Sequence, residues 1–142
     1  MPTALKIAYL WHDGDVVQVR ITVENAEFRG TADVYVGTDG LFEAAARLAG
    51  FPANNLDKRE VIFGAAGKQF SGGFVRLEFY CEGGAGHATF RATVEADYRN
   101  RELAESSVVH VSFEPAALDA FLPQLQQVES EHRGFASLVT AP

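Results

Sequence analysis

Apolar and polar side chains alternate over most of this chain, and the longest alternating run covers residues 87–97. Successive side chains of a β-strand point to opposite faces of the sheet, so this run has one apolar face and one polar face. Strands that are buried on both faces have continuous apolar runs instead. The alternation therefore predicts an antiparallel sheet with one face against a core and the other in water. The apolar positions of the run are Ala88, Phe90, Ala92, Val94 and Ala96.

The first 36 residues have the pattern of a three-stranded meander. Asp13-Gly14 is a dipeptide favoured in two-residue hairpin turns, and Asn25-Ala26 supplies a second tight turn. In the third strand we expect Phe28 and the apolar residues after it to face inward, with Gly30 marking a bulge or a close backbone approach. The three expected strands cover residues 5–12, 16–24 and 27–36.

The period becomes helical after residue 38. Leu41, Ala45 and Leu48 share one face of a short helix, and Gly50 followed by Pro52 ends it. Four further strands and a second helix then complete the chain. We expect the first helix at residues 40–49, the strands at 59–63, 74–81, 87–97 and 107–113, and the second helix from Glu114-Pro115 onward.

The second helix has an apolar stripe that should lie on the sheet. Pro115 fits the first helical position, where its missing N–H is harmless. Pro123 removes a hydrogen bond from the helix interior, so we expect a kink or a restart there. The stripe consists of Leu118, Phe121, Leu122, Leu125 and Val128.

These elements predict a single α+β domain over residues 1–142, a length that can bury one core without disulfides or metals. The expected architecture is a mainly antiparallel sheet of about seven strands. Along the chain it comprises a three-strand meander, a helix, a four-strand meander and a C-terminal helix, with both helices on one face of the sheet.

Charge limits the class of partner. The chain has 12 Lys and Arg residues against 19 Asp and Glu, a formal net charge of −7 that repels the phosphate backbone of nucleic acids. The same charge would speed the encounter with a basic protein. The apolar stretch Ile7–Trp11 is too short for a signal peptide core or a membrane span, so we expect a cytoplasmic protein without membrane contact. Cys81 is the only cysteine and is best interpreted as a core residue.

No familiar catalytic or metal motif is present, so we expect no catalytic residue, no metal and no cofactor. His12, Asp13 and Asp15 are close in sequence, but a metal site needs three or four converging ligands, and a surface contact at the turn explains them better. His110 could act as a general base, although no partner for it can be named. The other histidines are scattered over the expected elements: His87 and His132.

Outward-facing strand positions carry both signs of charge together with arginines and tyrosines. Arg and Tyr are enriched at the centres of protein interfaces. A solvated sheet with cross-strand ion pairs would have much the same composition, and that interpretation stays open. The candidate binding residues are Arg20, Arg29, Tyr35, Arg76, Tyr80 and Arg91.

The order of elements resembles the small bacterial immunity proteins of the WapI-like families. The resemblance is one of pattern over most of the chain, and its clearest part is the closing strand-to-helix step VHVSFEPAALDAFL at residues 109–122. It implies a non-enzymatic protein that binds and neutralises a cognate bacterial toxin, with an acidic balance suited to a basic toxin.

The leading hypothesis is therefore a protein-binding module, monomeric or homodimeric, whose open sheet face or loop edge binds a protein partner. One alternative is a small-molecule-binding protein or small enzyme with a pocket between sheet and helices. Another is an interaction subunit of a larger assembly. The pocket of the first alternative would involve Tyr9, Trp11, Cys81 or His110.

Overall fold

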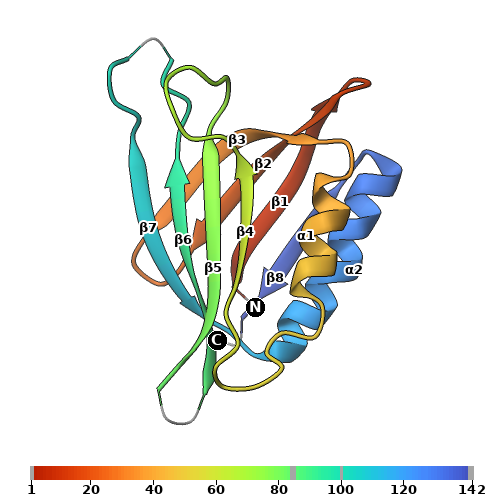
Figure 1. The fold of residues 1–142 in the computed structure, drawn as a ribbon, viewed down its shortest axis with the longest axis vertical. Helices are drawn as coiled ribbons and strands as arrows, with labels where there is room; N and C mark the ends of the chain where they lie inside the picture. The colour runs from red at the N-terminus through yellow and green to blue at the C-terminus, as the bar shows by residue number, and fades with distance from the viewer. Residues whose placement is uncertain (1, 84–85, 100, 141–142) are drawn as a thin grey trace.

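The strands of this protein form two antiparallel sheets of four strands each, accompanied by two helices (Figure 1). The computed structural model describes residues 2–83, 86–99 and 101–140. Sheet A has the strand order β3-β2-β1-β8, and sheet B has the order β4-β5-β6-β7. The strands of sheet A are β1 (Thr3–His12), β2 (Val16–Glu24), β3 (Arg29–Gly37) and β8 (Phe135–Val139). Those of sheet B are β4 (Arg59–Gly64), β5 (Phe74–Glu82), β6 (His87–Glu95) and β7 (Ser106–Ser112). The helices are α1 (Gly40–Leu48) and α2 (Pro115–Glu131).

The predicted α+β class, the antiparallel pairing and the positions of both helices agree with this structure. The prediction of one sheet with about seven strands differs from it in two respects. The two meanders form separate sheets, and an eighth strand, β8, pairs with β1 after α2. Alternation fixes which face of a strand is apolar but not which strands become neighbours, so sequence periodicity could not separate the sheets.

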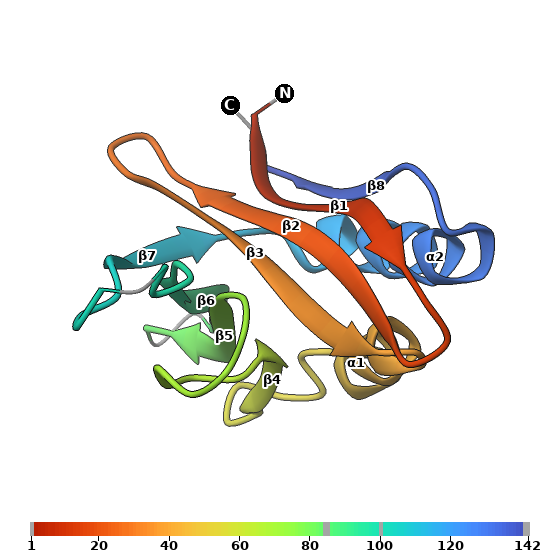
Figure 2. The ribbon, with the colours of Figure 1, turned by 90° about the horizontal axis from the view of Figure 1, so that it is seen from above.

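Sheet B and both helices cover the same face of sheet A (Figure 2). The helices pack against each other, and α2 contacts β1 and β8 while α1 contacts β3 and β4. Strand β3 crosses over sheet B and contacts all four of its strands. The core therefore lies between one face of sheet A and a second layer made of sheet B and the helix pair. Its aromatic centre consists of Phe51, Phe79, Phe90 and Phe113, with ring centroids 5.4–6.5 Å apart.

Two glycines allow β3 to lie close to sheet B. A Cβ atom on Gly30 would lie 3.3 Å from the Val94 side chain, so the predicted close approach at Gly30 is confirmed. A Cβ atom on Gly73 would lie 2.5 Å from the carbonyl oxygen of Glu95. The Gly73 N–H donates to the Asp33 carbonyl oxygen at 2.8 Å, which ties the start of β5 to β3.

The start of β3 corrects one detail of the sequence prediction. Phe28 precedes the strand and is 64% exposed rather than facing inward, because it lies in the hairpin connection. Asn25 accepts the backbone N–H groups of Glu27 and Phe28 there, as expected of a tight turn.

The first hairpin differs by one residue from the expected one. The backbone N–H of Asp13 donates to the carbonyl oxygen of Val16, so the turn residues are Gly14 and Asp15. The predicted turn at Asp13-Gly14 is therefore placed one residue too early.

Both ends of α1 are bonded by residues from other elements. At its start, Glu129 of α2 accepts the Leu41 N–H at 3.3 Å. At its end, the Arg59 guanidinium donates to the carbonyl oxygens of Arg47 and Ala49 at 3.1 and 2.7 Å. Tertiary contacts thus supply the caps that this short helix lacks locally.

Helix α2 runs through Pro123 without a restart. Pro123 and Asp119 are both exposed, so the carbonyl group of Asp119 that loses its partner faces water. No helix in the described ranges is long and apolar enough to cross a membrane.

Candidate functional site

The six candidate binding residues lie on two different surfaces. Both sheets turn their apolar faces to the shared core, so their polar faces point away from each other. The residues that sequence reasoning grouped together therefore cannot contact one partner surface of ordinary shape. Arg20, Arg29 and Tyr35 belong to sheet A, and Arg76, Tyr80 and Arg91 belong to sheet B.

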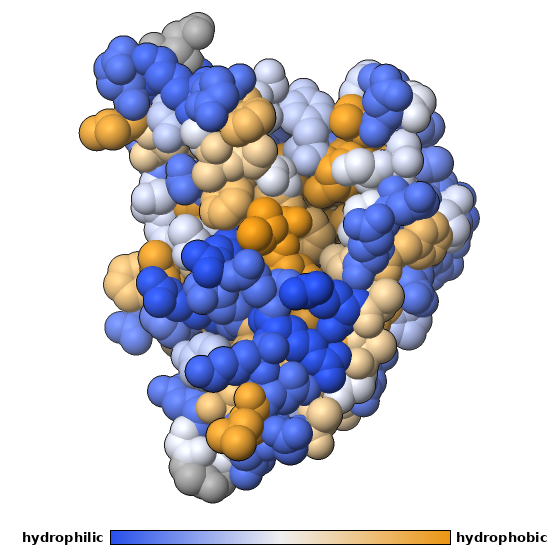
Figure 3. All heavy atoms as spheres, viewed as in Figure 1, coloured by the Kyte–Doolittle hydropathy of each residue, from blue (hydrophilic) through white to orange (hydrophobic). Residues whose placement is uncertain are grey.

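The outer face of sheet B carries charged side chains, and a band of hydrophilic residues crosses the front of the molecule in Figure 3. Arg76 of β5 pairs with Glu60 of β4 at 2.6 Å and lies 3.6 Å from Glu78. The hydrogen bond that Arg76 donates to Glu60, reinforced by the charges of Glu60 and Glu78, raises the pKa of Arg76. Burial raises the pKa of Tyr80, and the charge of Glu82 adds to this. Cross-strand pairing accounts for most of this face.

A groove lies beside β3 at the outer face of sheet A. It has a volume of about 680 Å³, and all three of the candidate residues on sheet A line it. The opposite wall comes from two loops of sheet B, at Ser71-Gly72 and at residues 96–99. These loops reach past β3 because that strand crosses the ends of sheet B. A surface formed by both sheets thus brings Arg20, Arg29 and Tyr35 together.

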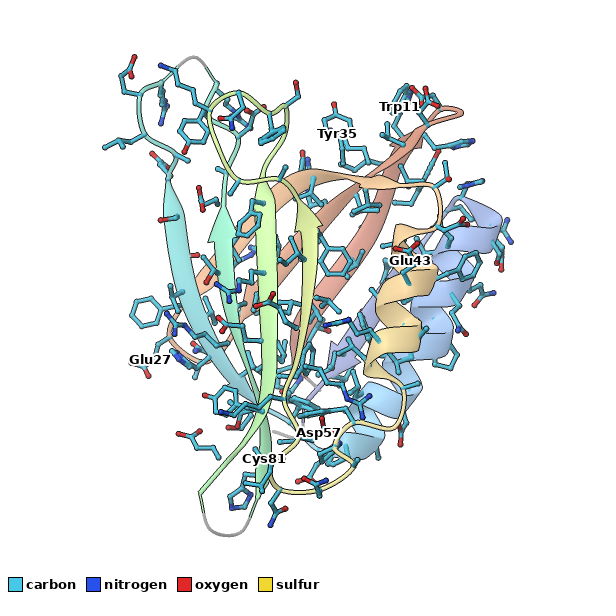
Figure 4. The ribbon with its side chains drawn as sticks, viewed as in Figure 1. Trp11, Glu27, Tyr35, Glu43, Asp57 and Cys81 are labelled. Atoms are coloured by element: carbon cyan, nitrogen blue, oxygen red, sulfur yellow. The ribbon has the colours of Figure 1, made fainter. Side chains whose placement is uncertain are left out.

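The wall at the β4–β5 loop is held close to β3 by two contacts. One is the hydrogen bond from Gly73 to Asp33. The other is the packing of the Tyr35 ring on Gly72, where an added Cβ atom would lie 2.8 Å from a ring carbon. Tyr35 is half-buried as a result, and Figure 4 shows its side chain near the upper end of the molecule.

The arginines of the groove differ in their partners. Arg20 forms a two-point ion pair with Asp33, at 2.8 and 3.1 Å, and this hydrogen-bonded pair raises the pKa of Arg20. Arg29 and Arg99 are exposed, and neither forms an ion pair with any carboxylate in the described ranges. Asp97 accepts the backbone N–H of Arg99 at 3.4 Å. The groove therefore offers two free guanidinium groups beside a neutralised ion pair.

Sequence reasoning missed Arg99 and the loop positions of this wall. Strand β6 ends at Glu95, two residues before the end of the predicted strand at 87–97, so Ala96 and Asp97 belong to the loop that connects β6 to β7, and the rest of this loop has no periodic pattern. Only the crossing of β3 over sheet B brings this loop to the groove, and no local signal in the sequence encodes that crossing.

A second cavity, of about 530 Å³, lies between β4 and α1. Its charged lining residues are Glu43, Arg47 and Glu60, and the side chain of Arg47 donates to the Glu60 carbonyl oxygen. This is a pocket between sheet and helix, as the small-molecule alternative requires. Its lining is different from the one that the sequence suggested.

The four residues named for that pocket are dispersed. Trp11 is 48% exposed at one end of the molecule, whereas Cys81 lies at the opposite end (Figure 4). Cys81 is half-buried, packs against the core and contacts the Asn54 carbonyl oxygen at 3.8 Å. His110 is exposed on β7, and its carbonyl oxygen accepts the Asn25 side chain.

Tyr9 belongs instead to a histidine cluster between β1 and the end of α2. The Tyr9 hydroxyl lies 2.7 Å from Nδ1 of His12, and the His12 ring stacks on His132 with centroids 4.0 Å apart. Asp13 uses its carboxylate to accept the N–H groups of Asp15 and Val16, which lowers the pKa of Asp13. Within the described residues, no three His, Cys, Asp or Glu side chains are arranged to hold a metal ion.

Comparison of the chain with protein families, with characterised proteins and with solved structures finds no match.

Proposed function

We propose that this protein is a non-catalytic protein-binding module that neutralises a bacterial toxin in the cytoplasm, and that the groove beside β3 belongs to its binding surface. The observation that carries the proposal is the meeting of Arg20, Arg29 and Tyr35 with Arg99 in one groove. Arg and Tyr are the residue types that most often dominate binding energy at protein interfaces. Two of the arginines have no ion pair within the described ranges, so they are available to a partner.

Two further observations support a toxin as the partner. The net charge of −7 would accelerate association with a basic toxin through long-range attraction. The order of elements also resembles the WapI-like immunity families, whose members would need only a binding surface and no catalytic groups.

The test combines capture with protection. The immobilised full chain is exposed to a lysate of its source organism, and captured proteins are identified by mass spectrometry. Each is then expressed in a laboratory bacterial host with and without this chain. We expect one captured protein to arrest growth when expressed alone and to lose this effect when the chain is co-expressed. Captured proteins that never impair growth, or a growth arrest that co-expression leaves unchanged, would contradict the proposal.

The cavity between β4 and α1 favours a second candidate function, the binding of a small molecule. Glu43 and Arg47 would contact a polar ligand there, and the exposed Ile62 lies on the same rim. A screen of charged metabolites by thermal shift tests this function, because a ligand that binds only the folded state raises the melting temperature. The shift should disappear in Glu43→Ala and persist in His110→Ala, since His110 does not line this cavity.

A further inference from the structure

We infer that the groove beside β3 receives an acidic segment of the partner protein, whose carboxylates bind Arg29 and Arg99. This inference rests on the proposed function and names the chemistry of the segment that contacts the groove. It concerns the contact itself, whereas the net charge of the chain governs attraction at longer range.

The first support is the lack of internal partners for these two arginines in a chain rich in carboxylates. The chain has 19 Asp and Glu residues for 12 Lys and Arg residues. Six of those cations form ion pairs: Arg20, Arg59, Lys68, Arg76, Arg101 and Arg133. Arg29 is directly opposite Glu24 in the β2–β3 register, yet the two side chains form no ion pair. Its guanidinium therefore remains available at the groove.

The second support is the position of Arg29 and Arg99 on different walls. Arg29 begins β3, whereas Arg99 belongs to the β6–β7 loop, and both line the groove. A segment lying in the groove can thus be bound from both sides. Each guanidinium has a planar fork of donors that matches a carboxylate with two parallel hydrogen bonds. Tyr35 offers an aromatic ring and a hydroxyl group beside them.

The third support is that the groove suits the flexible carboxylate side chains of a peptide better than the phosphate backbone of a nucleic acid. Asp33 and Asp97 also line it, and only Asp33 is neutralised by an arginine in the described part of the chain. Closely spaced phosphates would be repelled by Asp97 and by the net charge of −7. Asp or Glu side chains spaced along a peptide can reach the two arginines and avoid Asp97.

The test uses the full chain and a fluorescein-labelled hexaglutamate peptide, with hexalysine as the matched peptide of opposite charge. Binding is measured by fluorescence anisotropy at low salt. We expect hexaglutamate to bind and the variant Arg29→Glu/Arg99→Glu to bind it at least about tenfold more weakly, because charge-assisted hydrogen bonds are lost and repulsion is added.

The control is Arg91→Glu/Arg133→Glu, which changes the net charge by the same amount at exposed positions outside the groove. Its affinity for hexaglutamate should lie within about twofold of the wild-type affinity, once the added long-range repulsion from its more negative net charge is corrected for. The milder pair Arg29→Gln/Arg99→Gln, checked for native circular dichroism, covers the case in which charge reversal prevents folding. It should also weaken binding.

Several results would overturn the inference. One is that the groove variant and the control variant bind hexaglutamate equally weakly. Another is that hexalysine binds the wild type as tightly as hexaglutamate does. A third is that inorganic phosphate displaces the labelled peptide at the same concentration as free hexaglutamate. A captured toxin that is neutralised equally by the wild type and by Arg29→Glu/Arg99→Glu would refute this docking site and the placement of the binding surface at the groove, while the neutralisation of a toxin would stand. Hexaglutamate binding at the groove without any neutralised toxin would contradict the proposed function alone.

Discussion

Glu129 is a charged residue that the fold buries, with only 3% of its surface exposed. One carboxylate oxygen accepts the Leu41 N–H at the start of α1, where the helix dipole favours negative charge. The other oxygen has no hydrogen-bond partner within the described ranges. Burial raises the pKa of Glu129, and repulsion from Asp39 adds to this, while the Leu41 hydrogen bond opposes it.

This raised pKa predicts a pH-dependent loss of stability. Unfolded Glu129 ionises from about pH 4.3 upward. In the folded state the Glu129 carboxyl keeps its proton to higher pH. The free energy of unfolding therefore falls as the pH rises above the pKa of unfolded Glu129, until Glu129 also ionises in the folded state. Glu129→Gln removes the charge and keeps an acceptor for Leu41. Urea denaturation at pH 4 to 8 should show the wild type losing stability relative to this variant as pH rises. A constant difference between the two proteins would contradict the prediction.

Arg59 joins β4 to the end of α1. It pairs with Asp57 at 2.9 Å, with only 21% and 14% of the two side chains exposed, and it bonds two carbonyl groups of α1. The hydrogen bond from Arg59 lowers the pKa of Asp57. Its guanidinium also lies over the Phe51 ring at 5.6 Å.

Arg59→Ala should therefore lower the free energy of unfolding by about 2–3 kcal/mol, because it leaves Asp57 with only the Ala53 N–H as a partner and removes the donor to two carbonyl groups at the end of α1. The matched control is Arg101→Ala, whose pair with Glu105 is exposed by 63% and 82%. Such a surface pair should contribute less than about 0.5 kcal/mol. Chemical denaturation measures both, and equal effects of the two substitutions would show that Arg59 is not a structural link.

At the scale of elements, the crossing of β3 over sheet B shapes the groove. The β4–β5 loop must lie against β3 for its residues to form a wall, and Gly73 makes this possible. Gly73→Ala would place a Cβ atom 2.5 Å from the Glu95 carbonyl oxygen and 3.0 Å from Ala32. We expect a loss of about 1–3 kcal/mol in the free energy of unfolding, since the clash includes backbone atoms.

Gly37→Ala is the control for this substitution, because Gly37 lies on β3, the strand that the β4–β5 loop packs against, but an added Cβ atom there meets nothing within 4 Å. Its effect should stay within about 0.5 kcal/mol. Thermal melts of the two variants distinguish a crowded crossing from a general intolerance of side chains at glycine positions. Comparable melting temperatures for both would contradict the close packing described here.

Each outermost strand has a backbone group bonded by a neighbouring element. Such bonds reduce the tendency of open edges to pair with other chains. Gly73, Arg47 and Asn25 donate to the carbonyl oxygens of Asp33 on β3, Glu60 on β4 and His110 on β7, and the Ser137 N–H on β8 donates to the Gln124 side chain. This pattern agrees with a partner that binds through side chains in the groove rather than by adding a strand to a sheet.

Sequence reasoning located most strands because each has its own hydrophobic period. It predicted the helices for the same reason, although the restart that it allowed at Pro123 does not occur, since α2 is continuous from Pro115 to Glu131. Strand β8 was missed because five residues are too short for a clear pattern. The division into two sheets depends on long-range pairing, which a local period does not report.

The candidate site could be predicted only in part, for the same reason. Outward polarity identified Arg20, Arg29 and Tyr35 correctly as surface residues, but it also selected Arg76, Tyr80 and Arg91 on the opposite surface. Arg99 lies in a loop without periodicity, and its place at the groove comes from tertiary structure alone.

At the scale of the whole molecule, one core has two outer surfaces with different properties. On the outer face of sheet B, Arg76 is paired with acidic neighbours, while Arg91 is exposed and forms no ion pair in the described ranges. The surface of sheet A is hollowed at β3, where Arg29 and Arg99, both without ion pairs in the described ranges, line one groove. We therefore expect partner binding on the side of the groove and a solvated face on the other.

Titration calorimetry of the captured toxin against three forms of the chain tests this assignment most directly. The forms are the wild type, Arg29→Glu/Arg99→Glu in the groove and Arg91→Glu/Arg133→Glu outside it. We predict that the groove variant binds the toxin at least about tenfold more weakly and that the other variant binds within about threefold of the wild type. Full affinity in the groove variant, together with a loss of binding in the other, would place the interface elsewhere and contradict the account.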